Sequence, residues 1–203
     1  MGSADDCKIF NNTFSSNEYG IYLWSSSSNN IANNTFYLNG MFVYDSYNNK
    51  VTNNTVNEKP LVYLENVNDY VVEDAGQVIA INSNNITIKD LNLSYASVGV
   101  EFWNTNNSKI INNTASNNCY GIYLRYSSNN NIANNTVSNN DDGICLDDSS
   151  NNIIPATASR TTGMASFVVG VRATTSYTST TSSTTQIRFI LPLQQTSGTP
   201  SNQ

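Results

Sequence analysis

The sequence contains no histidine, only three cysteines and four prolines, and few charged residues, which make up 12% of its 203 positions. Nucleophilic centres of the Ser-His-Asp or Cys-His kind are excluded, because they need a histidine base. No run of 18 apolar residues is present, so we expect no membrane-spanning helix. The glycines stand singly, which excludes a glycine-rich phosphate-binding loop.

Basic residues are also scarce. Residues 1–154 hold 6 Lys and Arg against 15 Asp and Glu, and the whole chain has a net charge of −6. Nucleic-acid binding needs clustered Lys and Arg that face the phosphates. We therefore expect no nucleic-acid partner.

What the sequence does have is a repeat. Gly99, Gly121 and Gly143 stand 22 residues apart, and each opens a short β-prone apolar string. The same step separates Ile88, Ile110, Ile132 and Ile154. Upstream the steps are 22, 20, 20 and 17, between Ile9, Ile31, Val51, Val71 and Ile88. A repeat of this period is typical of stacked supersecondary units.

Each repeat is expected to form one coil of a parallel β-helix. In residues 132–150, β-prone pieces alternate with Asn, Ser and Asp clusters that favour turns, and no helical periodicity is present. The inward positions of its three strands are expected to be Ile132, Asn135, Val137, Ile144 and Leu146. The seven marker intervals predict about seven coils in one rod, roughly 34 Å long at the ~4.8 Å strand spacing.

Asparagine is a second marker of this fold. Residues 1–154 contain 35 Asn. The middle position of the Asn-Asn-Thr strings is held by Asn12, Asn34, Asn54, Asn113 and Asn135. Stacked in register, these amides would hydrogen bond along the axis as an asparagine ladder. A disordered Asn-rich tract is the alternative, but disorder does not require Ile and Gly at a fixed step.

Strings such as Asn-Asn-x-Ile-x-Asn-Asn-Thr-Val-Ser-Asn-Asn-x-x-Gly-Ile-x-Leu resemble the repeats of NosD-like right-handed parallel β-helix proteins, in the pectin-lyase-like superfamily. The resemblance covers about residues 7–154. It implies an all-β, right-handed parallel β-helix at an extracellular or cell-surface location, although no signal peptide is recognisable in the sequence. The family includes carbohydrate-active enzymes, carbohydrate-binding and surface-structural proteins, and a periplasmic factor linked to copper-enzyme maturation.

Three function classes follow from this resemblance. The favoured one is a non-catalytic scaffold that binds a polysaccharide or cell-envelope glycan, or forms envelope structure. The alternatives are a polysaccharide lyase or glycoside hydrolase, and a purely structural surface repeat protein. Copper is not expected, because the chain has no His and its three Met residues are scattered.

Two columns of residues supply the candidate binding face. Two and four positions past each glycine, strand alternation predicts outward side chains. Flat aromatic rings on a rigid sheet suit stacking on sugar rings, with Asn and Asp supplying hydrogen bonds. Tyr and Trp are also good strand formers that stack on one another without a ligand. The predicted carbohydrate-binding residues are Tyr22, Trp24, Tyr44, Trp103, Tyr123, Arg125, Asp142 and Asp147.

The acidic string 141–148 is the candidate for metal binding or catalysis. Asp142 precedes and Asp147 follows one apolar strand, and paired carboxylates suit Ca²⁺ or acid–base chemistry on a glycoside. The preceding coil places Arg125 over Asp147, which predicts an interstrand ion pair instead. We therefore expect no catalytic residues, no metal ligands and no cofactor, with Ca²⁺ as the weaker alternative.

The composition divides the chain into a β-helix domain, residues 4–155, and a tail, residues 156–203. The last 49 residues hold one Asn, no Asp or Glu, and 20 Ser plus Thr, which is typical of a linker or disordered tail. A frameshifted remnant is the alternative, because a one-base shift permits Asn-Asn-Ile at 174–176 and gives glycine at 165, both in the repeat register. The chain begins inside a coil, so we interpret it as a fragment; open coil ends favour end-to-end self-association.

The cysteines do not form a disulfide framework. Cys119 lies two residues before its glycine and Cys145 two after, so coil register offsets them by four residues. At the strand rise that offset is about 13 Å, beyond disulfide reach. We expect free thiols at Cys7, Cys119 and Cys145.

Overall fold

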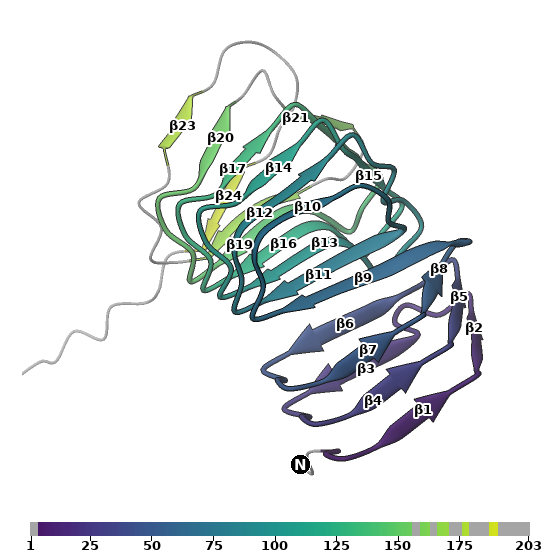
Figure 1. Cartoon of the computed structure of the whole chain (residues 1–203). Helices are drawn as coiled ribbons and strands as arrows, with labels where there is room; N and C mark the ends of the chain where they lie inside the picture. Colours follow the sequence, from purple (N-terminus) through teal and green to yellow (C-terminus); the bar gives the residue numbers. More distant parts are fainter. Residues whose placement is uncertain (1–3, 156–158, 163–165, 171–175, 179–186, 191–203) are drawn as a thin grey trace, which may run out of the picture.

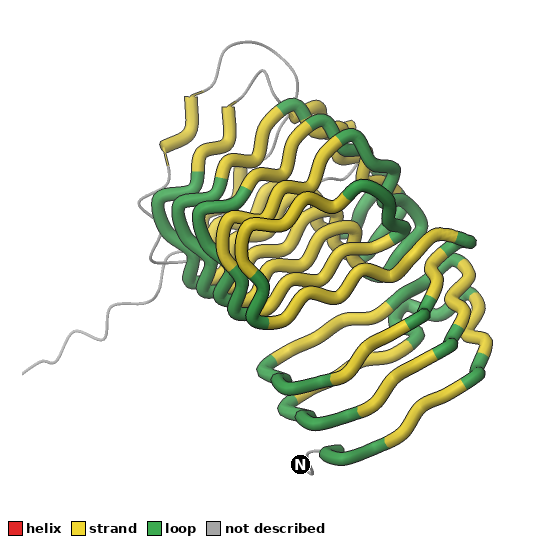
Figure 2. The backbone as a smooth tube through the Cα atoms, in the orientation of Figure 1, coloured by secondary structure: helices red, strands yellow, loops and turns green. Residues whose placement is uncertain are grey.

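The computed structural model describes residues 4–155, 159–162, 166–170, 176–178 and 187–190. Within these residues every regular element is a β-strand, and the chain winds into a parallel β-solenoid of about seven turns (Figure 1, Figure 2). Strands of one turn pair in parallel with the equivalent strands of the next. The predicted all-β repeat fold is confirmed.

The strands divide into an N-terminal and a C-terminal stack of coils. The strands of the N-terminal stack form three groups of paired neighbours. The first contains β1 (Lys8–Phe10), β4 (Asn30–Ala32) and β7 (Lys50–Thr52). The second contains β2 (Thr13–Ser15), β5 (Thr35–Tyr37) and β8 (Thr55–Val56), and the third contains β3 (Ile21–Trp24) and β6 (Met41–Tyr44). The long sheet of the C-terminal stack contains β9 (Lys59–Glu65), β11 (Gln77–Ile81), β13 (Val98–Trp103), β16 (Tyr120–Arg125), β19 (Asp142–Asp147), β22 (Ser166–Gly170) and β24 (Ile187–Ile190). Two further sheets belong to the C-terminal stack. The first contains β10 (Asn68–Val72), β12 (Asn84–Lys89), β14 (Lys109–Ile111), β17 (Asn131–Ala133), β20 (Ile153–Pro155) and β23 (Ser176–Thr178). The second contains β15 (Thr114–Ser116), β18 (Asn135–Ser138) and β21 (Ser159–Thr162).

The repeat register of the later coils is the one that the sequence predicts. Ile110 pairs with Ile132, and both are buried in the core of the C-terminal stack. The glycine column has a steric cause: a Cβ on Gly121 would lie 2.5 Å from the carbonyl oxygen of Gly143 and 2.6 Å from Val137 Cγ1. Only glycine therefore fits where successive coils approach this closely.

The two asparagines of each Asn-Asn-Thr string have different tasks. The first takes a left-handed backbone conformation, with φ of 57° at Asn11 and 58° at Asn112, which asparagine tolerates better than most residues. The second points inward and forms the predicted ladder. Asn113 Nδ2 donates to Asn135 Oδ1 at 3.1 Å, and Asn34 Nδ2 donates to Asn54 Oδ1 at 3.0 Å. The ladder is thus confirmed within each stack.

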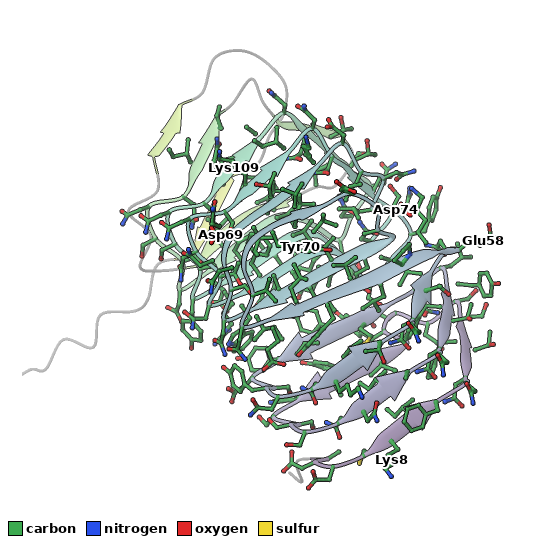
Figure 3. All side chains as sticks on the ribbon, in the orientation of Figure 1. Lys8, Glu58, Asp69, Tyr70, Asp74 and Lys109 are labelled. Carbon is green, nitrogen blue, oxygen red and sulfur yellow. The ribbon has the colours of Figure 1, made fainter. Side chains whose placement is uncertain are left out.

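The prediction of one uninterrupted rod is wrong. β8 does not continue into a parallel neighbour but pairs antiparallel with β9, through a two-residue turn at Asn57 and Glu58 with φ of 48° and 69°. Glu58 lies at the tip of this turn (Figure 3). β6 and β7 are the last strands of their sheets. The N-terminal stack therefore ends at residue 56, and the C-terminal stack starts afresh at residue 59 (Figure 1).

The same break corrects one marker column. Val72, not Val71, pairs with Ile88 and is buried, whereas Val71 is exposed. Val51 lies in β7 and has no pairing with β10. The 20- and 17-residue steps around Val71 therefore marked a change of stack.

Four strands of the segment 156–203 extend the C-terminal stack. β21, β22 and β23 pair in parallel with β18, β19 and β20, and β24 pairs with β22. Apart from these strands, the predicted tail, whether linker or frameshifted remnant, lies outside the residues that the structure describes.

The cysteines are free, as predicted: Cys7 is exposed, Cys119 half-buried and Cys145 buried. Across the residues placed in the structure, no helix long and apolar enough to cross a membrane occurs.

Candidate functional site

The junction between the two stacks is built on the free edge of β6. An edge strand has unpaired backbone groups, and here side chains from the C-terminal stack bind them. The Gln77 amide accepts from Met41 N at 2.9 Å and donates to the Met41 carbonyl. Ser97 Oγ accepts from Gly40 N at 2.8 Å. These contacts fix β6 against the outer face of the long sheet.

Glu101 completes this set of edge contacts. Its carboxylate accepts a hydrogen bond from Val43 N at 3.1 Å, and its side chain is fully buried. Burial raises the pKa of Glu101 well above its ordinary value, and the hydrogen bond from Val43 offsets this only in part. A carboxyl group is thus enclosed between the stacks, and among the residues that the structure describes no Lys or Arg is hydrogen-bonded to it.

Apolar and aromatic side chains fill the rest of the junction. Ile79 and Ile81, on the outward face of β11, belong to the hydrophobic core of the N-terminal stack. The Phe42 ring lies 5.7 Å from that of Tyr120 and 5.5 Å from that of Tyr123. The N-terminal stack therefore covers these outward side chains of the C-terminal stack.

A continuous series of aromatic contacts crosses the junction. We call it the aromatic strip, and its members are Tyr19, Tyr22, Trp24, Tyr44, Trp103 and Tyr126. Successive ring centroids are 5.4, 6.1, 6.1, 4.9 and 5.7 Å apart. The first four residues belong to the N-terminal stack and the last two to the C-terminal stack. The strip therefore joins two surfaces that are distant in sequence.

Arg125 is enclosed by this strip. Its guanidinium lies 4.7 Å from the ring centre of Tyr44, 5.3 Å from Trp103 and 4.9 Å from Tyr126, within the range of cation–π attraction. The same group forms an ion pair with Asp147, its register partner in β19. The predicted ion pair is thus confirmed.

The protonation of Arg125 follows from these neighbours. Burial acts against its charge, but hydrogen bonding with the Tyr123 and Tyr126 hydroxyls and the negative charge of Asp147 raise the pKa of Arg125 overall. Arg125 is therefore a permanent cation whose charge is neutralised by Asp147.

The structure divides the predicted binding residues into exposed and covered ones. Tyr22 and Trp24 are exposed, at 46% and 53%. Trp103 and Tyr123 are only 3% and 6% exposed, because the N-terminal stack covers them. The expectation that both columns form one open face is corrected for these two residues. Half-buried positions are held by Tyr44, Arg125, Asp142 and Asp147.

The two predicted aspartates do not converge. Asp142 and Asp147 mark opposite ends of β19, five residues or roughly 16 Å apart at the strand rise. Cooperating carboxylates in glycoside hydrolases lie about 5–9.5 Å apart. In the part of the chain that the structure describes, no three His, Cys, Asp or Glu side chains gather as a metal site would require.

Sequence reasoning missed Tyr126. This side chain is 46% exposed and ends the aromatic strip. It lies five residues past Gly121, an inward position under strict alternation, but its φ of 50° breaks the strand and turns the ring outward. The Tyr-Ser-Ser turn after the strand was the available signal.

Cys119 and Cys145 are poor nucleophiles and ligands. Burial, with nearby Glu18 and Asp141, raises the pKa of Cys119 to about 11. Burial, with Asp142 and Asp147, raises the pKa of Cys145 to about 12. Because the thiolate is the reactive form, both side chains are held as neutral thiols near pH 7.

A comparison with protein families found a match. The family model described as "Periplasmic copper-binding protein (NosD)" matches residues 1–75 and 58–183. Searches among curated proteins and among solved structures gave no match.

Proposed function

The chain belongs to the NosD family, and we propose that it is a non-catalytic β-solenoid of the cell envelope that binds a polysaccharide. The family is described as periplasmic, which supports an envelope location, at the periplasm or the cell surface. Tyr22 and Trp24 are the residues proposed to contact the polysaccharide first.

The observation that supports binding is the exposure of these two rings on a regular strand. In β3, Ile21 and Leu23 are buried while Tyr22 and Trp24 point outward. Their ring centroids are 6.1 Å apart with planes inclined by only 23°. Neighbouring exposed aromatics mark interaction surfaces, and their apolar faces match the C–H faces of pyranose rings.

The copper binding in the family's description does not fit the donors of this chain. Copper sites draw on His, Cys and Met, and the sequence has no His. Cys119 and Cys145 are held as neutral thiols, and Met41 is buried in the core of the N-terminal stack. We therefore derive no step through copper.

An enzymatic role is the second class, and no arrangement in the described coils favours it. A hydrolase or lyase of this fold would need acids that converge on one bond. The separation of Asp142 and Asp147 along β19 argues against such a pair.

Affinity electrophoresis in gels that contain purified cell-wall polysaccharides tests the proposal. We expect retardation of the native chain and about tenfold weaker binding by Trp24→Ala, which corresponds to ~1.4 kcal/mol. Tyr95→Ala is the matched control, because Tyr95 is also exposed but lies outside the aromatic strip. Equal retardation of all three proteins would contradict binding through Trp24, and no retardation of any would favour the purely structural role.

A further inference from the structure

We infer that the polysaccharide site extends across both stacks, from Tyr22 and Trp24 to Tyr126, and that it accepts a neutral glycan rather than an acidic one. This inference rests on the proposed function. It adds a binding residue, the course of the sugar chain and the chemical class of the ligand.

The course of the chain follows the aromatic strip. Its exposed rings are Tyr22 and Trp24 at one end and Tyr126 at the other. Between them lie Tyr44 and Trp103, whose rings contact each other at 4.9 Å. An extended polysaccharide stacked on Trp24 therefore has its next exposed aromatic surface on the other stack, at Tyr126.

The cation that the aromatic strip encloses, Arg125, is not available to an acidic sugar. The side chain of Arg125 is 16% exposed, and its guanidinium is already paired with Asp147. Three aromatic rings surround it within 5.3 Å of their centres. Binding a glycan carboxylate there would require breaking the Asp147 pair.

Two exposed carboxylates lie beside the strip. Asp45 follows Tyr44 directly, Asp148 follows Asp147, and both are exposed. These carboxylates accept hydrogen bonds from sugar hydroxyls but repel uronate or phosphate groups. The repulsion is weak and is screened within about 8–10 Å at physiological salt. It is therefore expected to select against polyanions without affecting neutral chains.

The first test compares ring deletions at matched exposure. Tyr126→Ala is expected to weaken binding to a neutral polysaccharide about tenfold, as Trp24→Ala does. Tyr70→Ala and Tyr95→Ala remove rings that are 47% and 51% exposed outside the aromatic strip and should leave affinity unchanged; Tyr70 lies on β10 (Figure 3). Loss of binding in Trp24→Ala but not in Tyr126→Ala would overturn the two-stack site while leaving the proposed function standing.

The second test compares ligand charge. Soluble mannan, dextran and mixed-linkage β-glucan serve as neutral probes, and alginate and polygalacturonate as acidic ones. We expect binding to at least one neutral probe and weaker binding to the acidic probes. The affinity for the acidic probes should rise between about 0.05 and 0.5 M salt, because salt screens the repulsion between the carboxylates of the protein and the ligand.

Each other outcome of the charge test has one meaning. Tighter binding to the acidic probes would overturn the neutral class while preserving the proposed function. Binding to neither class would overturn both the inference and the proposed function.

Discussion

The carboxylate of Glu101 accepts a hydrogen bond from the backbone N–H of Val43 at 3.1 Å, although 58 residues separate the two positions. Glu101 lies on the outer face of the long sheet, and Val43 lies on the free edge strand of the other stack. The Glu101 side chain thus accepts the backbone hydrogen bond that a neighbouring strand would otherwise accept from Val43. The angle between the stacks is fixed by such contacts.

The stability of the junction is expected to depend on pH through Glu101. Its pKa is near 4.3 in an unfolded chain and raised in the folded one, so the folded state holds the proton more tightly. This contribution is fully present below about pH 4.3 and is lost as pH rises through the raised pKa. Burial, with the charge of Glu101 as a smaller cause, raises the pKa values of Tyr22 and Tyr63, so both tyrosines stay neutral in that range.

Glu101→Gln tests this dependence, because the amide oxygen still accepts from Val43 but never ionises. The free energy of unfolding of the native chain should fall relative to Glu101→Gln as pH rises from about 4.5 to 8. Urea denaturation across this range measures it. A constant difference between the two proteins would contradict the assignment.

The two tryptophans are expected to have opposite roles. Trp103 is buried, and its indole N–H donates to the Tyr47 hydroxyl at 2.7 Å, so Trp103→Ala should cost about 3–5 kcal/mol of stability. Trp24→Ala, at an exposed site, should cost about 0.5 kcal/mol or less. Denaturant unfolding of both variants measures this, and equal losses would show that the burial assignments are incorrect.

Removing one amide of the asparagine ladder should be costly. Asn135 accepts from Asn113 N at 2.9 Å and donates to the Ile110 carbonyl at 2.7 Å. Asn135→Ala removes the side-chain partner of both buried groups, and we expect a loss of about 2–6 kcal/mol, at ~1–3 kcal/mol for each of the two groups. Thr136→Ala, on the exposed side of β18, is the control and should change little. Similar melting temperatures for the two variants would argue against the ladder.

The glycine column predicts a steric penalty. A Cβ at position 121 would meet Val137, Asn140 and the Gly143 carbonyl within 2.8 Å, so Gly121→Ala should destabilise the chain by about 1–3 kcal/mol. Thermal unfolding measures the change against Thr136→Ala. Unaltered stability would mean that the coils separate more easily than their register implies.

The periodic part of the fold could be predicted because each coil repeats the same contacts. Gly121 precedes Gly143 by one turn, and Asn113 binds Asn135, so a step of 22 residues identifies the neighbours. The free thiols and the Arg125–Asp147 ion pair follow from the same register. Such contacts can be predicted because the same residue types recur in the sequence at every repeat.

The junction could not be predicted, because it occurs once. The pairing of Gln77 with Met41 and of Glu101 with Val43 joins residues 36 and 58 positions apart, with no repeat to show it. The shortened steps near Val71 indicated an irregularity in the repeat, but they did not show that one stack ends there and another begins. Trp103 therefore met the rule for an outward side chain, yet the other stack buries it.

The most direct test of a sugar site at the exposed end of the aromatic strip uses the two tryptophans of the chain as reporters. In Trp103→Phe, all indole emission comes from the exposed Trp24, and titration with the neutral polysaccharide should shift this emission to shorter wavelength and protect it from acrylamide quenching. In Trp24→Phe, the emission of the buried Trp103 should not change. Unchanged emission of Trp24 at saturating polysaccharide would contradict the account.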